Sequence, residues 1–237
     1  MDNTIDCACL IHGDKYSWEY VEVLHGMLSR NFGVPIRLHV WTEALREVPN
    51  KYIKHNLIEM GLDGPKTAWW YKTQLFNTAQ FKGKMYYFDL DIIVASSLKW
   101  LTQLDTRSTF WAVRDFKYLW KDYNRQINSS VMVFDNSEMH WIWDKFYNNK
   151  EDIVKKYHGD QDYINECVIN KEFLNEDKIK SYRWQVLHGG LDFKNRSYPR
   201  RDEIDVELTP DTSLVIFHGK PNPHEVNNAK LTSLWQR

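Results

Sequence analysis

The sequence predicts an α/β protein built on a central, mostly parallel sheet flanked by helices. Apolar segments of strand length alternate with segments of helical periodicity through the first half of the chain, an order typical of strand–helix–strand units. The second half holds more predicted strands than helices, so mixed strand directions are expected there. The 237 residues suit one domain with a substantial core.

The elements of the first half each have a local signal. Residues 5–11 form an apolar run of strand length, and apolar side chains recur at helical spacing from Tyr20 to Leu28, with Ser17 as a suitable N-cap. The elements expected next are a strand at 35–41, a helix at 52–60 closed by Gly61, and a helix at 69–81.

The most informative segment is the apolar run 85–95, whose aromatic and β-branched residues predict a strand buried on both faces. Asp89 and Asp91 interrupt it, and because side chains alternate along a strand, both carboxylates are expected on one face. Two like charges beside apolar surface repel each other and are costly to bury, and a divalent cation relieves both effects. The alternative is a strand end with two solvated or arginine-paired acids.

The second half reads as a run of shorter elements. Strands are expected at 109–114, 130–134, 180–184 and 213–217, and helices at 138–148 and 160–168. Residues 189–212 carry glycines, prolines and many charges without periodicity, which predicts a long loop.

Charge and cysteine content exclude several classes of protein. The 31 Lys and Arg nearly balance the 32 Asp and Glu, so the charge favours neither nucleic acid nor an anionic membrane as a partner. No segment resembles a membrane span, and the acidic start does not resemble a signal peptide. The odd number of cysteines argues against a disulfide framework, and Cys7 and Cys9 are expected to be buried thiols. We therefore expect a soluble, cytoplasmic protein.

Polar residues are expected to gather beyond the carboxyl ends of the strands, where open α/β sheets bind ligands. Tyr16 follows the first strand, Asp160 and Gln161 begin a helix, and His218 follows a strand directly, beside Gly219. A histidine joining two carboxylates would suit Mn²⁺. The alternatives are a tyrosine packed on the following helix, an aspartate N-cap and a hydrogen-bonded structural histidine.

Lys72 lies on the apolar face of the helix predicted at 69–81, which it shares with Leu75, Phe76 and Ala79. A lysine on such a face either extends its ammonium group to solvent or meets a buried anion. Because Lys72 precedes the strand that bears Asp89, an ion pair to an aspartate or to a ligand is the functional alternative.

Five ordered segments together resemble one protein family. They are Lys72, Phe88-Asp-Leu-Asp-Ile-Ile-Val94, Asn128-Ser-Ser-Val-Met-Val133, Asp160-Gln-Asp-Tyr-Ile-Asn165 and Phe217-His-Gly-Lys-Pro221. Their order and spacing resemble the glycogenin-type retaining glycosyltransferases, a family that includes bacterial lipopolysaccharide galactosyltransferases. The resemblance extends from the first strand to about Pro223.

The resemblance implies a single Rossmann-like domain of the nucleotide-diphospho-sugar transferase fold over residues 1–237. Residues 1–125 would form the nucleotide-binding half, and residues 126–237 would hold the donor sugar and the acceptor. The implied donor is a UDP-sugar bound with Mn²⁺, or with Mg²⁺ as the alternative. The implied activity is transfer of a hexose, glucose or galactose, to a glycan or another hydroxyl acceptor.

The same resemblance assigns roles to individual residues. Asp89 would contact the ribose and the metal ion, Asp91 and His218 would be metal ligands, and Gly219 and Lys220 would meet the diphosphate. Tyr16 would stack near uracil, Lys72 would hold the sugar or Asp89, and Asn128, Asp160 and Gln161 would line the donor sugar. Two departures from the family pattern concern Ser130, where glycine is usual, and the shortened turn at 218–221.

The mechanism implied by the family has two forms. Retention of configuration proceeds either through a covalent sugar on Asp160 or Gln161, or by attack of the acceptor on the face that the diphosphate leaves. The double displacement requires a well-placed nucleophile. No side chain is an unambiguous nucleophile from the sequence, so same-face attack is favoured.

Two other functions fit parts of the sequence. Asp89 and Asp91 after apolar residues also resemble the first motif of haloacid-dehalogenase-type phosphatases, although that motif normally lies near the N-terminus. The 11 tryptophans suit a non-catalytic sugar-binding module, because aromatic faces stack on sugars.

Overall fold

A seven-stranded sheet forms the centre of the protein in a computed structural model that describes residues 3–62, 67–119, 125–186 and 208–237. The strand order is β3-β2-β1-β4-β7-β6-β8, in which β7 runs antiparallel to both neighbours and the remaining pairs are parallel. The expected mostly parallel sheet with mixed directions in the second half is therefore confirmed. The strands are β1 (Ile5–Leu10), β2 (Ile36–Thr42), β3 (Ile53–Asn56), β4 (Lys84–Phe88), β6 (Phe110–Arg114), β7 (Ile127–Asp135) and β8 (Lys171–Phe173).

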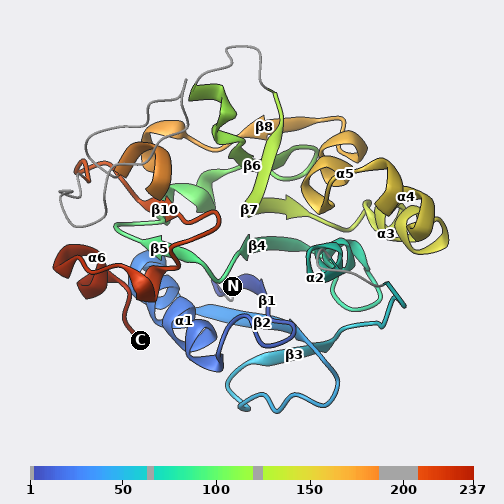
Figure 1. Cartoon of the computed structure of the whole chain (residues 1–237), viewed down its shortest axis with the longest axis horizontal. Coiled ribbons are helices and arrows are strands. Elements are labelled where there is room, and N and C mark those ends of the chain that lie inside the picture. Colours follow the sequence, from blue (N-terminus) through green and yellow to red (C-terminus); the bar gives the residue numbers. More distant parts are fainter. Residues whose placement is uncertain (1–2, 63–66, 120–124, 187–207) are drawn as a thin grey trace.

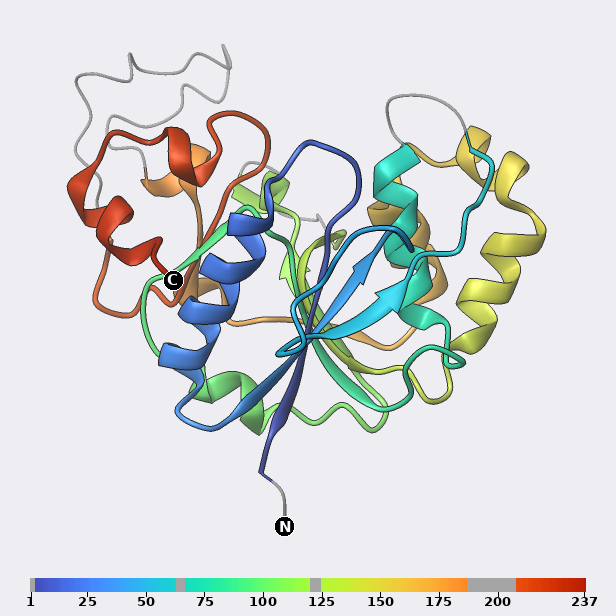
Figure 2. The ribbon, with the colours of Figure 1, turned by 90° about the horizontal axis from the view of Figure 1, so that it is seen from below.

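Helices cover both faces of this sheet (Figures 1 and 2). On one face α1 (Trp18–Phe32) and α6 (Ala229–Leu234) lie beside a small second sheet. On the other lie α2 (Thr67–Trp70), the 3₁₀ helix η1 (Tyr71–Phe76), α3 (His140–Asn148), α4 (Lys150–Lys156) and α5 (Asp160–Cys167). The shorter turns are η2 (Lys99–Gln103), η3 (Phe116–Leu119), η4 (Glu176–Lys178), η5 (Tyr182–Val186) and η7 (Pro223–Glu225).

The segment 85–95 is not one strand, and this is the correction that matters most for the site. β4 ends at Phe88 in the large sheet, whereas β5 (Ile92–Val94) pairs antiparallel with β10 (Leu214–Ile216) in a three-stranded sheet completed by β9 (Ile179–Ser181). Asp89 and Asp91 therefore lie in the crossing between two sheets rather than on one strand face. Hydrophobicity shows that both flanking segments are buried, but it does not reveal that they have different strand partners.

Three further boundaries differ from the sequence prediction. The prediction of a helix at 52–60 is wrong. Residues 53–56 form strand β3, which pairs in parallel with β2, and the residues that follow β3 up to position 60 have no helical structure. The helix expected at 69–81 ends at Phe76 and becomes a 3₁₀ helix after Trp70. The strand expected at 180–184 stops at Ser181 and continues as a π-helical turn. Elements β8, α4 and α6 were not anticipated.

The loop expected near 189–212 lies outside the described residues up to position 207. Where the structure describes the chain, none of its helices combines the length and the apolar character needed to cross a membrane. Cys7 and Cys9 are buried free thiols, as expected, and Cys167 is also a buried free thiol.

A polar cluster lies on strands β1, β2 and β3. His39 Nε2 is 2.9 Å from Asp6 Oδ1, and His39 Nδ1 is 2.8 Å from His55 Nε2. Because the Asp6 carboxylate accepts a hydrogen bond from Nε2–H, a neutral His39 has its lone pair on Nδ1, which accepts a hydrogen bond from His55 Nε2–H. The His55 ring also stacks on Trp41 at a centroid distance of 4.1 Å. The arrangement therefore favours two neutral histidines.

This cluster predicts that the protein loses stability on acidification. Burial, and then the repulsion that a protonated His39 would exert, lower the pKa of His55 to about 4 from the ordinary 6.5. Between these pH values the unfolded chain binds more protons than the folded one, so the free energy of unfolding falls as the pH falls through this window. Urea titrations from pH 7 to pH 4 should show this decline, and His55→Gln should reduce it. A decline of equal size in the variant would assign the effect to other groups.

Candidate functional site

A cavity of about 880 Å³ opens at the edge of the large sheet where β1 and β4 end and the antiparallel β7 begins. Its volume is within the range of small-molecule sites. Eight residues that the sequence singled out lie in its wall: Tyr16, Lys72, Asp89, Asp91, Asp160, Gln161, His218 and Gly219. Residues from both halves of the chain therefore meet at one cavity, at the position that open α/β sheets use for ligands.

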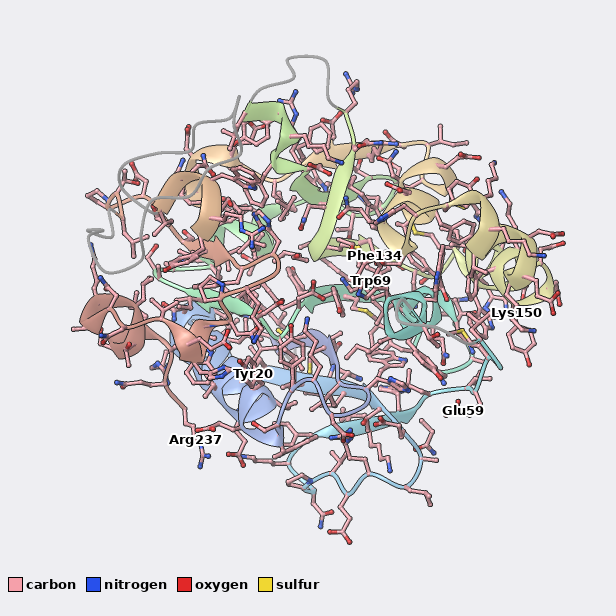
Figure 3. All side chains as sticks on the ribbon, viewed as in Figure 1. Tyr20, Glu59, Trp69, Phe134, Lys150 and Arg237 are labelled. Atoms are coloured by element: carbon pink, nitrogen blue, oxygen red, sulfur yellow. The ribbon has the colours of Figure 1, made fainter. Side chains whose placement is uncertain are left out.

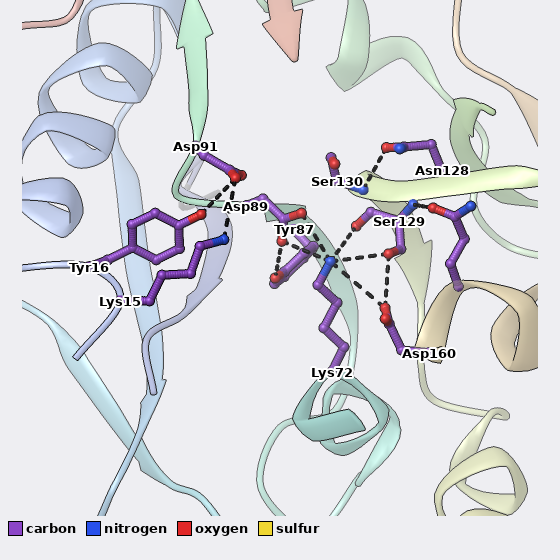
Figure 4. A network of polar contacts seen from close by, with 11 residues as sticks. Lys15, Tyr16, Lys72, Tyr87, Asp89, Asp91, Asn128, Ser129, Ser130 and Asp160 are labelled. Atoms are coloured by element: carbon purple, nitrogen blue, oxygen red, sulfur yellow. Dashed lines mark hydrogen bonds and ion pairs between the residues drawn. The ribbon is translucent and has the colours of Figure 1, made fainter. Parts of the chain in front are cut away.

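Lys72 is the centre of a largely buried ionic network (Figure 4). Its Nζ lies 3.0 Å from Asp89 Oδ2, 2.9 Å from Asp89 Oδ1 and 3.8 Å from Asp160 Oδ2. It also donates to Ser129 Oγ at 3.1 Å, and Tyr87 donates to Asp89 Oδ1 at 2.6 Å. Burial alone would lower the pKa of Lys72, but Asp89 and Asp160 outweigh burial and raise it. Of the two alternatives for Lys72, the ion pair to an aspartate is the one observed.

Asp160 is the first residue of α5, and its helix neighbour Gly159 occupies the N-cap position. The carboxylate accepts a hydrogen bond from Ser129 Oγ at 2.9 Å, and burial raises its pKa despite the opposing effects of Lys72 and Ser129. Gln161 is held at both ends, because its oxygen accepts from the Ser129 amide at 3.3 Å and its nitrogen donates to Asp115 at 3.1 Å. Both side chains thus face the cavity in fixed orientations.

Asp91 lies on the opposite side of Asp89 from Asp160 (Figure 4). The Tyr16 hydroxyl donates to Asp91 Oδ2 at 2.6 Å, and Lys15 Nζ is 3.9 Å from the same oxygen. Burial, and then the charge of Asp89, raise the pKa of Asp91 to about 6. The negative charge at this position is therefore incompletely compensated by the protein's own groups.

His218 borders the cavity as a neutral imidazole. Its Nε2 lies 2.6 Å from Ser181 Oγ, and its ring stacks on Phe116 at a centroid distance of 5.3 Å. Burial, and then the nearby Arg183, lower the pKa of His218 to about 4. Neutral imidazole is the form that binds metal ions.

Two predicted residues stand apart from the cavity wall. Asn128 Oδ1 accepts from the Ser130 amide at 3.0 Å, while Ser129 and Ser130 themselves line the cavity. Lys220 pairs with Glu225 at 2.6 Å through a largely exposed side chain. Gly219 has φ of 88°, so the turn after His218 uses a backbone conformation that favours glycine.

The residues proposed as metal ligands fit a cation in their chemistry, although they are not assembled around one point. Among the described residues, no three His, Cys, Asp or Glu side chains are grouped closely enough to hold a metal ion. Asp91 is instead held by Tyr16, and His218 by Ser181. The two carboxylates and the neutral imidazole are nevertheless the oxygen and nitrogen donors that Mn²⁺ accepts.

Several residues in the site were missed from the sequence. Ser129 joins Lys72, Asp160 and Gln161, and its position inside the motif 128–133 was the available signal. Lys15 and Trp69 also line the cavity. Neither has a local sequence signal, since a lysine in a loop and a tryptophan in an apolar helix are ordinary features.

Comparisons with known proteins bear on the fold. No protein-family model and no curated protein matches the sequence. Among solved structures, the galactosyltransferase LgtC in complex with donor and acceptor sugar analogues is similar at a TM-score of 0.63 and 14% identity, covering 98% of this chain and 95% of LgtC. The glycosyltransferase GlyE of Streptococcus pneumoniae TIGR4 gives 0.67 and 16%, covering 98% of this chain and 60% of GlyE. The bifunctional glycosyltransferase WbbM gives 0.63 and 12%, covering 94% of this chain and 47% of WbbM.

At such identities the similarity establishes the fold. This chain has the fold of these glycosyltransferases, as the five sequence motifs predicted.

Proposed function

We propose that this chain is a glycosyltransferase that moves a hexose, glucose or galactose, from a UDP-sugar to a hydroxyl of a glycan or another acceptor. The observation that carries the proposal is the largely buried Lys72–Asp89–Asp160 network at the wall of an 880 Å³ cavity, in a chain with the fold of glycosyltransferases. In this proposal residues 1–125 hold the nucleotide, and residues 126–237 hold the donor sugar and the acceptor.

The proposed nucleotide contacts are those that the family resemblance implies, and the positions of Asp89, Tyr16 and Gly219 in the cavity wall support them. Asp89 contacts the ribose, held in place by Lys72 and Tyr87. Tyr16 lies near the uracil once its hydroxyl leaves Asp91. The backbone of Gly219 approaches the diphosphate, and Lys220 joins it by exchanging its exposed partner Glu225 for phosphate.

A divalent cation, Mn²⁺ or Mg²⁺, is part of the proposal. Asp89, Asp91 and His218 would hold it, with Asp91 releasing Tyr16 and His218 releasing Ser181. The raised pKa of Asp91, caused by burial and then by Asp89, supports a need for positive charge here. A bound cation supplies electrostatic stabilisation of the leaving diphosphate.

The donor sugar is proposed to lie between Lys72 and α5. Ser129 and Ser130 line its pocket, and Asn128 fixes the backbone of Ser130. Asp160 and Gln161 orient the sugar hydroxyls. Because the Asp160 carboxylate is engaged by Ser129 and Lys72, and because an amide is a weak nucleophile, same-face attack by the acceptor is favoured over a covalent sugar on Asp160 or Gln161.

The two alternative functions receive less support. A phosphatase nucleophile at Asp89 is disfavoured because Lys72 and Tyr87 engage both of its oxygens and reduce their nucleophilicity. A carboxylate engaged in this way still has lone pairs that accept contacts from a hydroxyl group or a cation. A sugar-binding module without catalysis would not need buried charges around the cavity, which are costly to desolvate.

A nucleotide-sugar panel tests the proposal. We expect UDP-glucose or UDP-galactose to be turned over with Mn²⁺, with release of UDP, and the rate to fall at least about tenfold in EDTA. GDP-mannose and p-nitrophenyl phosphate serve as the contrasting substrates. Failure of the protein to bind UDP with either metal, or phosphate release from p-nitrophenyl phosphate without metal, would contradict the assignment.

A further inference from the structure

Trp69 differs from the other tryptophans of this protein in its environment. Of the tryptophans that the structure describes, only Trp69 and Trp141 are strongly exposed, at 43% and 45%. Trp69 lies in the cavity wall, and Trp141 does not. The adjacent Trp70 is 3% exposed, and its ring stacks on Phe146 at a centroid distance of 5.3 Å. The short helix α2 therefore places the Trp70 indole in the core and the Trp69 indole at the cavity.

The Trp69 ring is held against the segment that leads to Asp160. A Cβ atom at Gly159 would lie 3.0 Å from Trp69 Cε3 and 3.5 Å from Cζ3. Gly159 has an extended backbone, which any residue adopts, so its conformation does not require glycine. The absence of a side chain at Gly159 instead leaves space for the Trp69 indole. The His158 ring lies 6.0 Å from that of Trp69 at an angle of 36°, and both line the cavity.

The position of this surface relative to the reacting groups suggests its ligand. Trp69 precedes Lys72 by one helical turn, and Gly159 directly precedes Asp160. Tyr16 and Asp91, the groups proposed for the nucleotide side, form a separate contact with each other on the far side of Asp89 (Figure 4). In the view of Figure 3, Trp69 lies near the middle of the picture, whereas Lys150 and Arg237 lie toward its edges.

We propose that Trp69, seated on Gly159 and accompanied by His158, is a stacking platform for a ring-containing carbohydrate acceptor. This inference rests on the proposed glycosyltransferase activity and narrows its acceptor to a glycan. An exposed indole offers a large apolar face to the C–H face of a pyranose, and Asp162 and His158 in the same wall offer polar atoms to its hydroxyls. A cavity of about 880 Å³, near the upper end for small-molecule sites, has room for an acceptor beside the donor.

The test measures glycan binding and UDP binding in the same set of variants. Fluorescently labelled wild type, Trp69→Ala, Trp69→Phe and Trp141→Ala are applied to a printed oligosaccharide array with UDP and Mn²⁺, and UDP affinity is measured by calorimetry. We expect wild type to bind at least one glycan, Trp69→Ala to lose this binding at least tenfold, Trp69→Phe to retain most of it, and Trp141→Ala to match wild type. The UDP affinity of Trp69→Ala should stay within twofold.

Gly159→Ala provides a second variant that acts through the ring. The methyl group that Gly159→Ala adds should displace the Trp69 ring and weaken glycan binding. In a protein that already carries Trp69→Ala, Gly159→Ala should not weaken glycan binding further. Thermal unfolding of each variant verifies folding.

Three outcomes would overturn the acceptor platform. They are glycan binding that Trp69→Ala leaves intact, a wild type that binds no glycan, and loss of UDP affinity in Trp69→Ala, which would make the indole a nucleobase contact. Failure of wild type to bind UDP would instead refute the proposed transferase, so the two failures are distinguishable.

Discussion

Asp91→Asn is expected to lower Mn²⁺-dependent turnover of the UDP-sugar about 100-fold. The variant keeps the shape of the side chain but removes the anionic oxygens proposed to hold the cation. Loss of about 3 kcal/mol of leaving-group stabilisation corresponds to this factor. Steady-state release of UDP as a function of Mn²⁺ concentration measures the effect, and the Mn²⁺ dependence should shift to higher concentration together with the loss of rate.

The stability of the same variant gives an independent measurement. Burial and Asp89 disfavour the Asp91 carboxylate, so Asp91→Asn should unfold at the same temperature as wild type or at a higher one. Asp211→Asn, at an exposed position outside the cavity, is the matched control and should keep the full rate. Equal rates in Asp91→Asn and wild type would remove Asp91 from the cation site.

Lys72→Met is expected to destabilise the protein by about 3 kcal/mol. The Lys72 ammonium lies within 4 Å of both Asp89 and Asp160, and the three side chains are largely buried. Removing one partner of such an ion pair leaves uncompensated charge. The corresponding drop in melting temperature is on the order of 10 °C for a chain of this size. Urea unfolding at neutral pH measures the free energy directly.

Substitution of a surface lysine is the control that separates the loss of stability in Lys72→Met from the general cost of removing a positive charge. Lys155 lies on α4 with an exposed side chain, and Lys155→Met should change stability by less than about 0.5 kcal/mol. If Lys72→Met were as stable as Lys155→Met, the network at the cavity wall would not hold the two carboxylates in place. Lys72→Arg should be less damaging than Lys72→Met, because it retains the positive charge.

The sequence predicted those residues of the candidate site that can be recognised by their type and their order along the chain. The acids at 89 and 91, the pair Asp160–Gln161 and His218 were expected at the carboxyl ends of strands, and all of them line the cavity. Lys72 was singled out because a lysine on an apolar face requires an anion or a route to solvent. Asn128 and Lys220 entered through the family resemblance, and they contact Ser130 and Glu225 instead.

Some contacts had no signature in the sequence because they depend on long-range packing. The link through Ser129 joins η1, β7 and α5, three elements that are distant in sequence. The hydrogen bond from Tyr16 to Asp91 spans 75 residues. The position of Trp69 depends on the packing of α2 against the segment before α5, and helical periodicity does not distinguish Trp69 from its neighbour Trp70.

The sequence by itself determined the class of fold, the burial of most strands and the identity of the charged residues, because these follow from apolar periodicity and the cost of burying charge. Only the tertiary structure decided that the segment 85–95 is divided between two sheets. Asp89 thereby turns toward Lys72 and Asp91 toward Tyr16. The physical reason is that strand pairing is a long-range choice: Phe88 and Ile92 are equally buried, and the partners that separate them lie more than 40 residues further along the chain, on β7 and β10.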